Sequence, residues 1–271
     1  MKTTLPGLMA EDKKVSVVNF LGSFAVEVFR YLHDLFLLTT AAASGMFVRK
    51  RRRGIVLKYI EEIGLGSLPL AGIISTFTGM VLVMETVSEL KKFGAAMYTA
   101  SIVSVSMVRE LGPVLVGLIV AGRVGAAIAA ELGTMKITEQ IDALKVLAVD
   151  PVNFLVSPRF LGGLVALPIL FLIAFFLAIG GGFLVGVHLV GIGPGMYLSQ
   201  TFRFVTLKDL AVGLLKIVAF TTIIINVACL EGFRARGGAE GVGRASTSAV
   251  VSSFFLIILA NLVITAIFYF F

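Results

Sequence analysis

The sequence predicts an all-α integral membrane protein, with one helix at the membrane surface and five transmembrane helices. The 271 residues are 58% hydrophobic and only 14% charged, whereas about a quarter of the residues in a soluble domain are charged. Apolar runs long enough for a helical crossing, which needs about 20 residues, lie near 63–86, 102–130, 160–187, 209–230 and 247–271. An ordinary cytoplasmic enzyme is therefore excluded.

The first 58 residues are expected to form a cytoplasmic segment with a surface helix. Polar residues recur there every three or four positions and draw one narrow stripe: Ser16, Asn19, Ser23, Glu27, Arg30 and Asp34. Such a stripe fits either a core helix of a bundle or a helix in the membrane interface. The basic run 49–53 favours the interface, because it would hold the helix on an anionic leaflet. Residues 59–271 then form the membrane domain.

The second span is unusual because Arg109, Glu110 and Arg123 lie inside it. An ionisable residue at membrane depth is costly unless it is paired or hydrated, and it indicates a functional site. Arg109 and Glu110 are adjacent, so on a helix they point about 100° apart and should find separate partners. Gly112–Pro113 weakens the helix just after them, as expected where a span bends around a cavity. Alternatively, Arg109 snorkels to the outer interface and Glu110 caps it.

The connection after the second span is amphipathic from about Thr134 to Val149, and Asp150–Pro151 is expected to end this helix. Such a helix is either a simple surface connection or a plug that fits a groove on a cytoplasmic partner.

The remaining spans carry signals for packing and for the interface. Small residues recur at helical spacing at Ala121, Gly125, Ala129, Gly182 and Gly186. Helix faces made of small residues let helices approach closely. We expect these residues to pack helices within one subunit rather than to form a dimer interface. The last span ends in the aromatic run 268–271, which suits an aromatic belt at the membrane interface.

The basic residues predict the orientation. With a cytoplasmic N-terminus, segments 1–58, 131–159 and 231–247 hold 16 Lys and Arg, against 4 in 87–101 and 188–208. This asymmetry follows the positive-inside rule, so with an odd number of spans we expect the C-terminus on the side of the membrane opposite the cytoplasm. The net charge of +7 then reflects topology, and no nucleic-acid partner is expected.

Motifs of an enzyme are missing from the sequence. It has no G-x-x-x-x-G-K-[ST] phosphate loop, no Ser/His/Asp grouping and no H-E-x-x-H. Cys229 is the single cysteine, and His33 and His188 are far apart, which disfavours a metal site. Any ATP must be hydrolysed by another subunit.

Segment 109–159 contains the elements RELGP, AGR-x-G, AAELG, EQIDAL and VDP in this order. These elements resemble the signature block of the MlaE (YrbE-type) permease family, and the similarity extends to GRAST at 243–247. It is weakest in the first 45 residues. The resemblance implies a non-catalytic permease subunit of an ATP-binding-cassette (ABC) transporter, a multi-pass protein of a bacterial inner membrane whose C-terminus would then be periplasmic. Such a transporter moves phospholipid between the inner membrane and the periplasm or outer membrane and maintains the lipid asymmetry of the outer membrane.

The resemblance also implies partners. Two copies would form a homodimer, each binding a cytoplasmic ABC ATPase (MlaF-like) that uses ATP and Mg, while the chain itself binds no cofactor. A periplasmic MCE-domain protein (MlaD-like) would sit over the dimer, and some systems add a STAS-domain protein (MlaB-like). The ATPase would bind the connection after the second span, here called the coupling helix, through Lys136, Glu139, Gln140, Ile141, Asp142, Leu144 and Lys145.

Residues for a lipid cavity follow from the same resemblance. In ungapped register from RELGP, the acyl chains would meet Leu82, Leu90 and Phe93, and the headgroup would lie near Arg109 and Glu110. Lys216 and Arg244 align with basic positions of the family. The loop SELKKFGAAM is more charged than the family pattern, which puts the placement of Leu90 and Phe93 in doubt.

Two other functions stay open from the sequence. An ion-coupled secondary transporter would use Arg109, Glu110 and Arg123 as a relay and would be expected to show inverted repeats, of which the sequence gives no sign. A purely structural membrane anchor predicts that changes to these charges are silent.

Overall fold

The computed structural model describes residues 8–46 and 53–270, and these residues are helical with short connections and no strand. Helical runs long and apolar enough to cross a membrane confirm the five expected spans: Gly54–Lys92, Ala96–Ile137, Val152–His188, Leu207–Arg234 and Gly238–Phe270. Each run extends beyond the predicted apolar segment on at least one side, because the helices continue past the hydrocarbon thickness into polar sequence.

Three of the spans are built from several helical segments. The first is α2 (Arg53–Ile60), η2 (Glu61–Leu65) and α3 (Gly66–Lys92); the second is η3 (Ala96–Tyr98), α4 (Thr99–Ser106), η4 (Met107–Leu111), α5 (Gly112–Val120), η5 (Ala121–Gly125) and α6 (Ala126–Ile137). The third is η6 (Val152–Val156) and α8 (Ser157–His188); α10 (Leu207–Arg234) and α11 (Gly238–Phe270) are the fourth and fifth. The segments η2, η4, η5 and η6 are π-helical turns.

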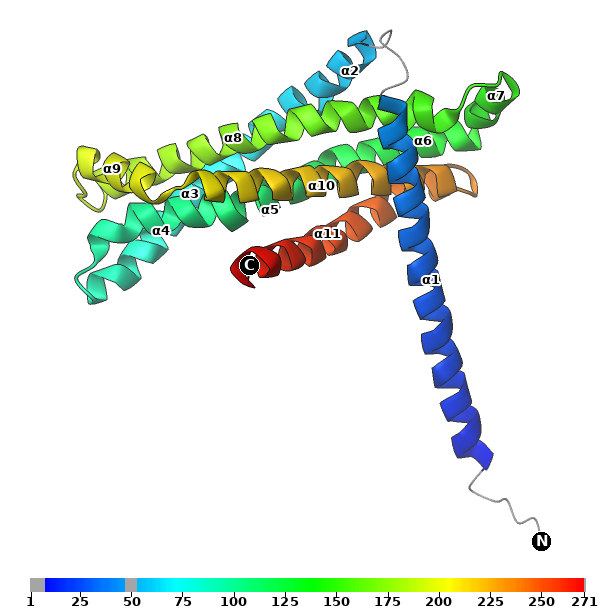
Figure 1. The fold of residues 1–271 in the computed structure, drawn as a ribbon, viewed down its shortest axis with the longest axis horizontal. Helices are drawn as coiled ribbons and strands as arrows, with labels where there is room; N and C mark the ends of the chain where they lie inside the picture. Colours follow the sequence, from blue (N-terminus) through cyan, green and yellow to red (C-terminus); the bar gives the residue numbers. More distant parts are fainter. Residues whose placement is uncertain (1–7, 47–52, 271) are drawn as a thin grey trace.

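The spans form one elongated bundle with two distinct ends (Figure 1). The α7 end carries α7 (Gln140–Val146) and the α10–α11 connection, and the α9 end carries α9 (Pro194–Phe204) and η3. Glycines bring α3 and α8 into backbone contact: a Cβ on Gly79 would lie 2.0 Å from the carbonyl oxygen of Ala178. A Cβ on Gly182 or Gly186 would meet Tyr197 of α9. These small residues therefore pack within one subunit.

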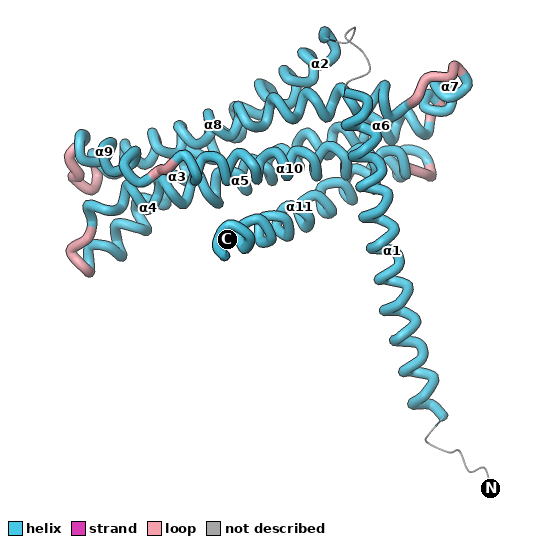
Figure 2. The backbone as a smooth tube through the Cα atoms, viewed as in Figure 1, coloured by secondary structure: helices cyan, strands magenta, loops and turns pink. Residues whose placement is uncertain are grey.

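The N-terminal helix α1 (Leu8–Met46) has 39 residues and crosses the bundle near its α7 end (Figures 1 and 2). Arg234 of α10 holds it there, because its Nη2 lies 2.5 Å from Asp34 and its guanidinium stacks over the Tyr31 ring at 5.1 Å. The helix runs across the spans rather than alongside them (Figure 1), which is the direction that an interfacial helix would take; its position at a membrane surface stays a prediction. Residues 49–52 of the basic run lie outside the described residues.

The coupling helix is shorter than predicted. Thr134–Ile137 forms the end of α6, and the separate helix α7 begins only at Gln140. The break falls at Glu139, whose φ of 61° is left-handed and cannot continue a right-handed helix. The chain therefore turns sharply, and α7 forms the tip of this end of the bundle (Figure 1).

Candidate functional site

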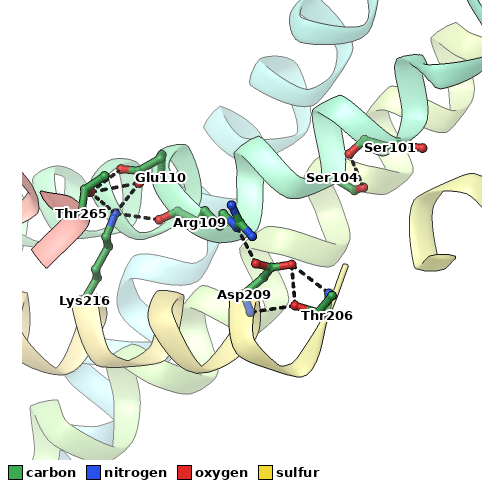
Figure 3. Close-up of polar contacts among 8 residues, drawn as sticks. All are labelled: Ser101, Ser104, Arg109, Glu110, Thr206, Asp209, Lys216 and Thr265. Carbon is green, nitrogen blue, oxygen red and sulfur yellow. Dashed lines mark hydrogen bonds and ion pairs between the residues drawn. The ribbon is translucent and has the colours of Figure 1, made fainter. Parts of the chain in front are cut away.

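Arg109 and Glu110 lie on η4, a π-helical turn in the second span. Such turns interrupt the regular α-helical register and are frequent at functional sites. Figure 3 shows the two side chains with separate partners: Glu110 contacts Lys216 and Thr265, and Arg109 contacts Asp209.

Lys216 of α10 is fully buried and is held by three acceptors. Its Nζ lies 2.6 Å from Oε1 of Glu110, and it donates to the carbonyl oxygen of Arg109 at 2.9 Å and to Oγ1 of Thr265 at 2.8 Å. An ammonium group has three donors, so each has an acceptor. A buried charge is tolerated when it is paired and hydrogen-bonded, and Lys216 meets both conditions.

The Glu110 carboxylate is fixed on its inner side and open on the other. Thr265 Oγ1 donates to Oε1 at 3.0 Å, and Asn261 Nδ2 donates to Oε2 at 3.1 Å. Asn261 and Thr265 are four residues apart and so share one face of α11. The Glu110 side chain is still 39% exposed, so a ligand can approach a carboxylate that the protein has already oriented.

Asp209 positions Arg109 from the start of α10. Its Oδ2 accepts from the Thr206 backbone N–H at 2.9 Å, and Thr206 Oγ1 accepts from the Asp209 N–H at 3.3 Å, which completes a capping box. Its Oδ1 accepts from Nε of Arg109. This bond leaves the two terminal amino groups of Arg109 available, and its side chain is 52% exposed.

A cavity of about 150 Å³ opens over these groups. Its lining residues are Arg109, Glu110, Lys208, Asp209, Val212, Thr265, Phe268 and Tyr269. With Lys216 behind it, the cavity has three cationic side chains and two carboxylates. The excess positive charge and the exposed guanidinium suit an anionic group such as a phosphate, while the aromatic rings offer an apolar wall.

The structure brings together only part of the predicted lipid-cavity set, namely Arg109, Glu110 and Lys216. Leu82 is half-buried on α3. Leu90 is also half-buried, near the end of α3, and Phe93 is 80% exposed just after that helix. None of these three lines the cavity over Glu110.

Arg244 also lies apart, near the start of α11 at the α7 end, where it pairs with Glu240 at 2.6 Å. It lines a different cavity, of about 280 Å³, together with Arg234 and Arg236. The lipid-binding roles assigned to Arg244, Leu82, Leu90 and Phe93 stay predictions.

The predicted coupling residues gather on and around α7. Asp142 joins the two sides of the turn, with Lys136 of α6 at 2.9 Å and Lys145 at 3.0 Å. Hydrogen bonds from these two ammonium groups hold the pKa of the Asp142 carboxyl below its usual value.

Some apolar residues in and just after α7 are buried, and others are exposed. Ile141 is buried and Leu144 packs against the core, whereas Glu139 and Gln140 are exposed. Beyond them Val146 and Leu147 are 87% and 71% exposed. The tip of α7 thus presents a small apolar and charged surface to the exterior.

Sequence reasoning missed Asp209, Asn261 and Thr265. Asp209 lies at the start of the predicted span 209–230, where the pattern T-x-x-D in 206–209 signals the start of a helix. This signal accounts for the residue without its contact with Arg109. Asn261 and Thr265 are single polar residues in a long apolar run. Their four-residue spacing, which puts both on one helix face, was the available signal.

Comparisons with known proteins agree on one family. The family model described as Permease MlaE matches residues 56–267. A probable ABC transporter permease of Rickettsia typhi is 39% identical over 93% of this chain and 97% of its own length. The intermembrane phospholipid transport system permease protein MlaE of Haemophilus influenzae is 32% identical over 93% of this chain and 97% of its own length. The chloroplast protein TRIGALACTOSYLDIACYLGLYCEROL 1 of Arabidopsis thaliana is 35% identical over 79% of this chain and 61% of its own length.

Proposed function

The chain belongs to the MlaE permease family, and we propose that it is the membrane-spanning subunit of an ABC transporter that moves phospholipid between the inner membrane and the periplasm or outer membrane. The observation that carries this proposal is the charged cavity over Arg109 and Glu110, which the second, fourth and fifth spans line together. We infer that it holds the headgroup of the transported lipid and that the transport maintains the lipid asymmetry of the outer membrane.

The depth of the cavity supports this role. On the first span the uncharged run between Glu62 and Glu85 rises about 34 Å, close to the hydrocarbon thickness of about 30 Å. On the second span Glu110 lies only about 20 Å beyond Arg123. If Arg123 marks one membrane boundary, Glu110 is about 10 Å inside the other. To enter this site, a polar lipid headgroup would have to lose its contacts with water. The charged side chains of the site would replace those contacts.

One subunit holds only part of a lipid site. The cavity of about 150 Å³ is smaller than the roughly 300–1,000 Å³ of sites for small ligands, so acyl chains would extend outside it. Beside the cavity, α11 is only 11% buried over its most apolar stretch, against 50% for three other spans. A second copy facing this side would complete the site, which supports the homodimer.

The proposed ATPase contact is α7. Val146 at its end and Leu147 just after it are exposed and suit a hydrophobic groove on a cytoplasmic partner, and Glu139 and Asp142 add charges for specificity. The ATPase would supply the nucleotide site and use ATP and Mg. An MCE-domain protein over the α9 end would receive or deliver the lipid, with a STAS-domain protein as an additional subunit.

The second span would transmit movement of α7 to the lipid cavity. From η3 to α6 the chain is helical without a break, so one continuous helical run connects Glu110 to the turn at Glu139 that leads into α7. When two ATPases close, the α7 helices of two copies would move together. The spans would then narrow the cavity and displace the headgroup towards the MCE-domain protein.

The lipid site is tested with the complex purified from its native membrane and reconstituted in proteoliposomes. Glu110→Ala should lower ATP-dependent lipid transfer about tenfold, the effect of one charge-assisted hydrogen bond, while membrane insertion stays unchanged. Glu89→Ala, which removes an exposed carboxylate paired only with Lys92, is the matched control. Normal transfer in the Glu110 variant would refute the lipid role, and transfer driven by an ion gradient without ATP would favour the secondary transporter.

The partner contact needs a separate test. Glu139→Lys combined with Asp142→Lys should abolish co-purification of the ATPase, because both changes reverse charge at the tip that is proposed to dock. Undiminished co-purification would overturn the assignment of α7.

A further inference from the structure

A second polar cavity lies towards the α7 end of the bundle, away from Glu110. Its volume is about 240 Å³, and it lies between the first and second spans. Its charged and aromatic lining residues are Tyr59, Glu62, Arg123 and Glu131. Two π-helical turns meet here, since η2 supplies Glu62 and η5 supplies Arg123.

Among the side chains that the structure describes, no carboxylate lies within ion-pair distance of Arg123. Its Nη1 donates to the carbonyl oxygen of Glu62 at 3.1 Å and to Oγ of Ser67 at 2.9 Å, both uncharged groups. The guanidinium lies against Gly66, where a Cβ would come 2.3 Å from Nη2. The Arg123 side chain is nevertheless exposed. The protein thus orients a guanidinium without neutralising its charge.

This guanidinium lies at the boundary of the apolar slab. Going inward from the α7 end, the last charged residues of the spans are Glu62, Arg123, Arg159, Glu231 and Arg244, and each is followed by an uncharged run that is at least about 18 Å long. Such a level corresponds to lipid headgroups, where Arg side chains meet phosphates.

The carboxylates of the cavity lie on its outer side. Glu131 is two helical turns from Arg123, about 12 Å nearer the α7 end. Its Oε2 pairs at 2.7 Å with Arg159, which is 1% exposed and stacks on Tyr59 at 4.7 Å. Glu62 pairs at 3.5 Å with Lys58, one helical turn farther out. Both carboxylates thus have a cationic partner but stay about half exposed, at 55% for Glu131 and 53% for Glu62. The membrane side of the cavity therefore presents a guanidinium without an ion-pair partner, and the outer side presents accessible carboxylate oxygens.

We propose that this cavity binds the headgroup of a zwitterionic aminophospholipid of the adjoining leaflet. In such a lipid the phosphate lies nearer the acyl chains and the ammonium group lies farther out. The phosphate would accept from the unpaired Arg123, and the ammonium would lie between Glu62 and Glu131. A headgroup with a second negative charge would meet these carboxylates and be disfavoured. This site requires that the chain spans a bilayer, but it does not depend on the proposed transport.

The site is tested on the full-length chain in mild detergent with equimolar phosphatidylethanolamine and phosphatidylglycerol of matched acyl chains. Native mass spectrometry counts each lipid retained per chain. The wild type should retain more phosphatidylethanolamine, and Arg123→Gln should weaken its retention about tenfold, as expected for one charge-assisted hydrogen bond. Glu62→Gln should bring the ratio of the two lipids closer to one.

Gly66→Ala gives a second route that keeps every charge. The new Cβ would displace the guanidinium from its place against Gly66, while Ala is favoured over Gly in a helix, so the fold is retained. Gly122→Ala is the matched control, because its Cβ would meet only a Phe254 carbon at 3.9 Å. The first variant should lose phosphatidylethanolamine as Arg123→Gln does, and the control should not.

Two outcomes would overturn the proposal. Unchanged retention in Gly66→Ala and in Arg123→Gln would show that Arg123 is structural, and equal or greater retention of phosphatidylglycerol by the wild type would show that the amine is not recognised. Because the measurement uses neither ATP nor a partner, failure of ATP-dependent transfer would leave this result unaffected.

Discussion

Replacing Lys216 by methionine should destabilise the protein strongly, because it removes the ammonium and keeps an apolar side chain of similar length. Breaking a buried ion pair by removing one partner costs about 3–5 kcal/mol. The Glu110 carboxylate left behind is 39% exposed, so solvent screens part of this cost and about 2–3 kcal/mol is expected. At about 2 °C per kcal/mol for a chain of this size, Tm falls by about 4–6 °C.

A double-mutant cycle shows whether the loss comes from the pair itself. Glu110→Gln removes the charge but can keep hydrogen bonds with Asn261 and Thr265. Combined with Lys216→Met it should recover at least half of the lost Tm, because no buried charge is left without a partner. Lys208→Met, at an exposed lysine lining the same cavity, should change stability by less than about 0.5 kcal/mol.

The single cysteine provides the assay. Cys229 is fully buried, so a thiol-reactive dye reports unfolding of the full-length protein in detergent without any added label. If the double variant unfolds at the same temperature as Lys216→Met, or if Lys208→Met is equally damaging, then Lys216 and Glu110 do not stabilise each other and the reasoning is refuted.

Two further predictions concern the packing of the spans and the tip of the bundle. Gly79→Ala should push α3 away from α8, because the new Cβ would lie 2.0 Å from a backbone oxygen. Such overpacking lowers the free energy of unfolding by about 1–3 kcal/mol, which corresponds to a fall in Tm of about 2–6 °C. Gly180→Ala, with nothing within 4 Å, should leave the dye-measured Tm unchanged, and equal effects would contradict the contact. Lys136 and Lys145 lower the pKa of Asp142 in the folded state. The ionised Asp142 carboxylate therefore stabilises the fold fully above the pKa of about 4 that Asp has in an unfolded chain, and this stabilisation is lost as the pH falls through the lower pKa of the folded state. Hydrogen exchange in α7, corrected for intrinsic rates, should therefore lose protection below about pH 4 in the wild type, whereas a matching loss in Asp142→Asn would exclude this carboxyl as the cause.

The spans were predictable because each is a long apolar run, and length and composition alone define such a helix in a membrane. Local backbone geometry was not predictable in the same way. The left-handed Glu139 that separates α6 from α7 falls inside a continuous amphipathic pattern, and nothing in that pattern distinguishes one helix from two. The π-helical turns are equally hidden, because each changes the register by a single residue.

Only one half of the charged site, Arg109 and Glu110, was predictable from the sequence. Arg109 and Glu110 are conspicuous because they interrupt an apolar run, but their partners belong to helices about 100 residues or more away in the chain. Which residues face them depends on how the spans pack, and that is decided by close contacts such as those of Gly79 with α8. For the same reason Arg244, aligned with a basic position of the family, lies at the opposite end of the bundle from Lys216.

The structure also bears on a relay of Arg109, Glu110 and Arg123. A proton relay at membrane depth needs ionisable groups in sequence along its path. Between the level of Glu110 and that of Arg123, about 20 Å along the second span, that span holds only the uncharged residues 111–122. The neighbouring runs 63–84, 160–187, 217–230 and 245–268 contain no Asp, Glu, Lys, Arg or His either. Arg123 is therefore separated from the Glu110 cavity by a layer that contains no Asp, Glu, Lys, Arg or His in these runs, which favours two separate polar sites over one continuous ion pathway.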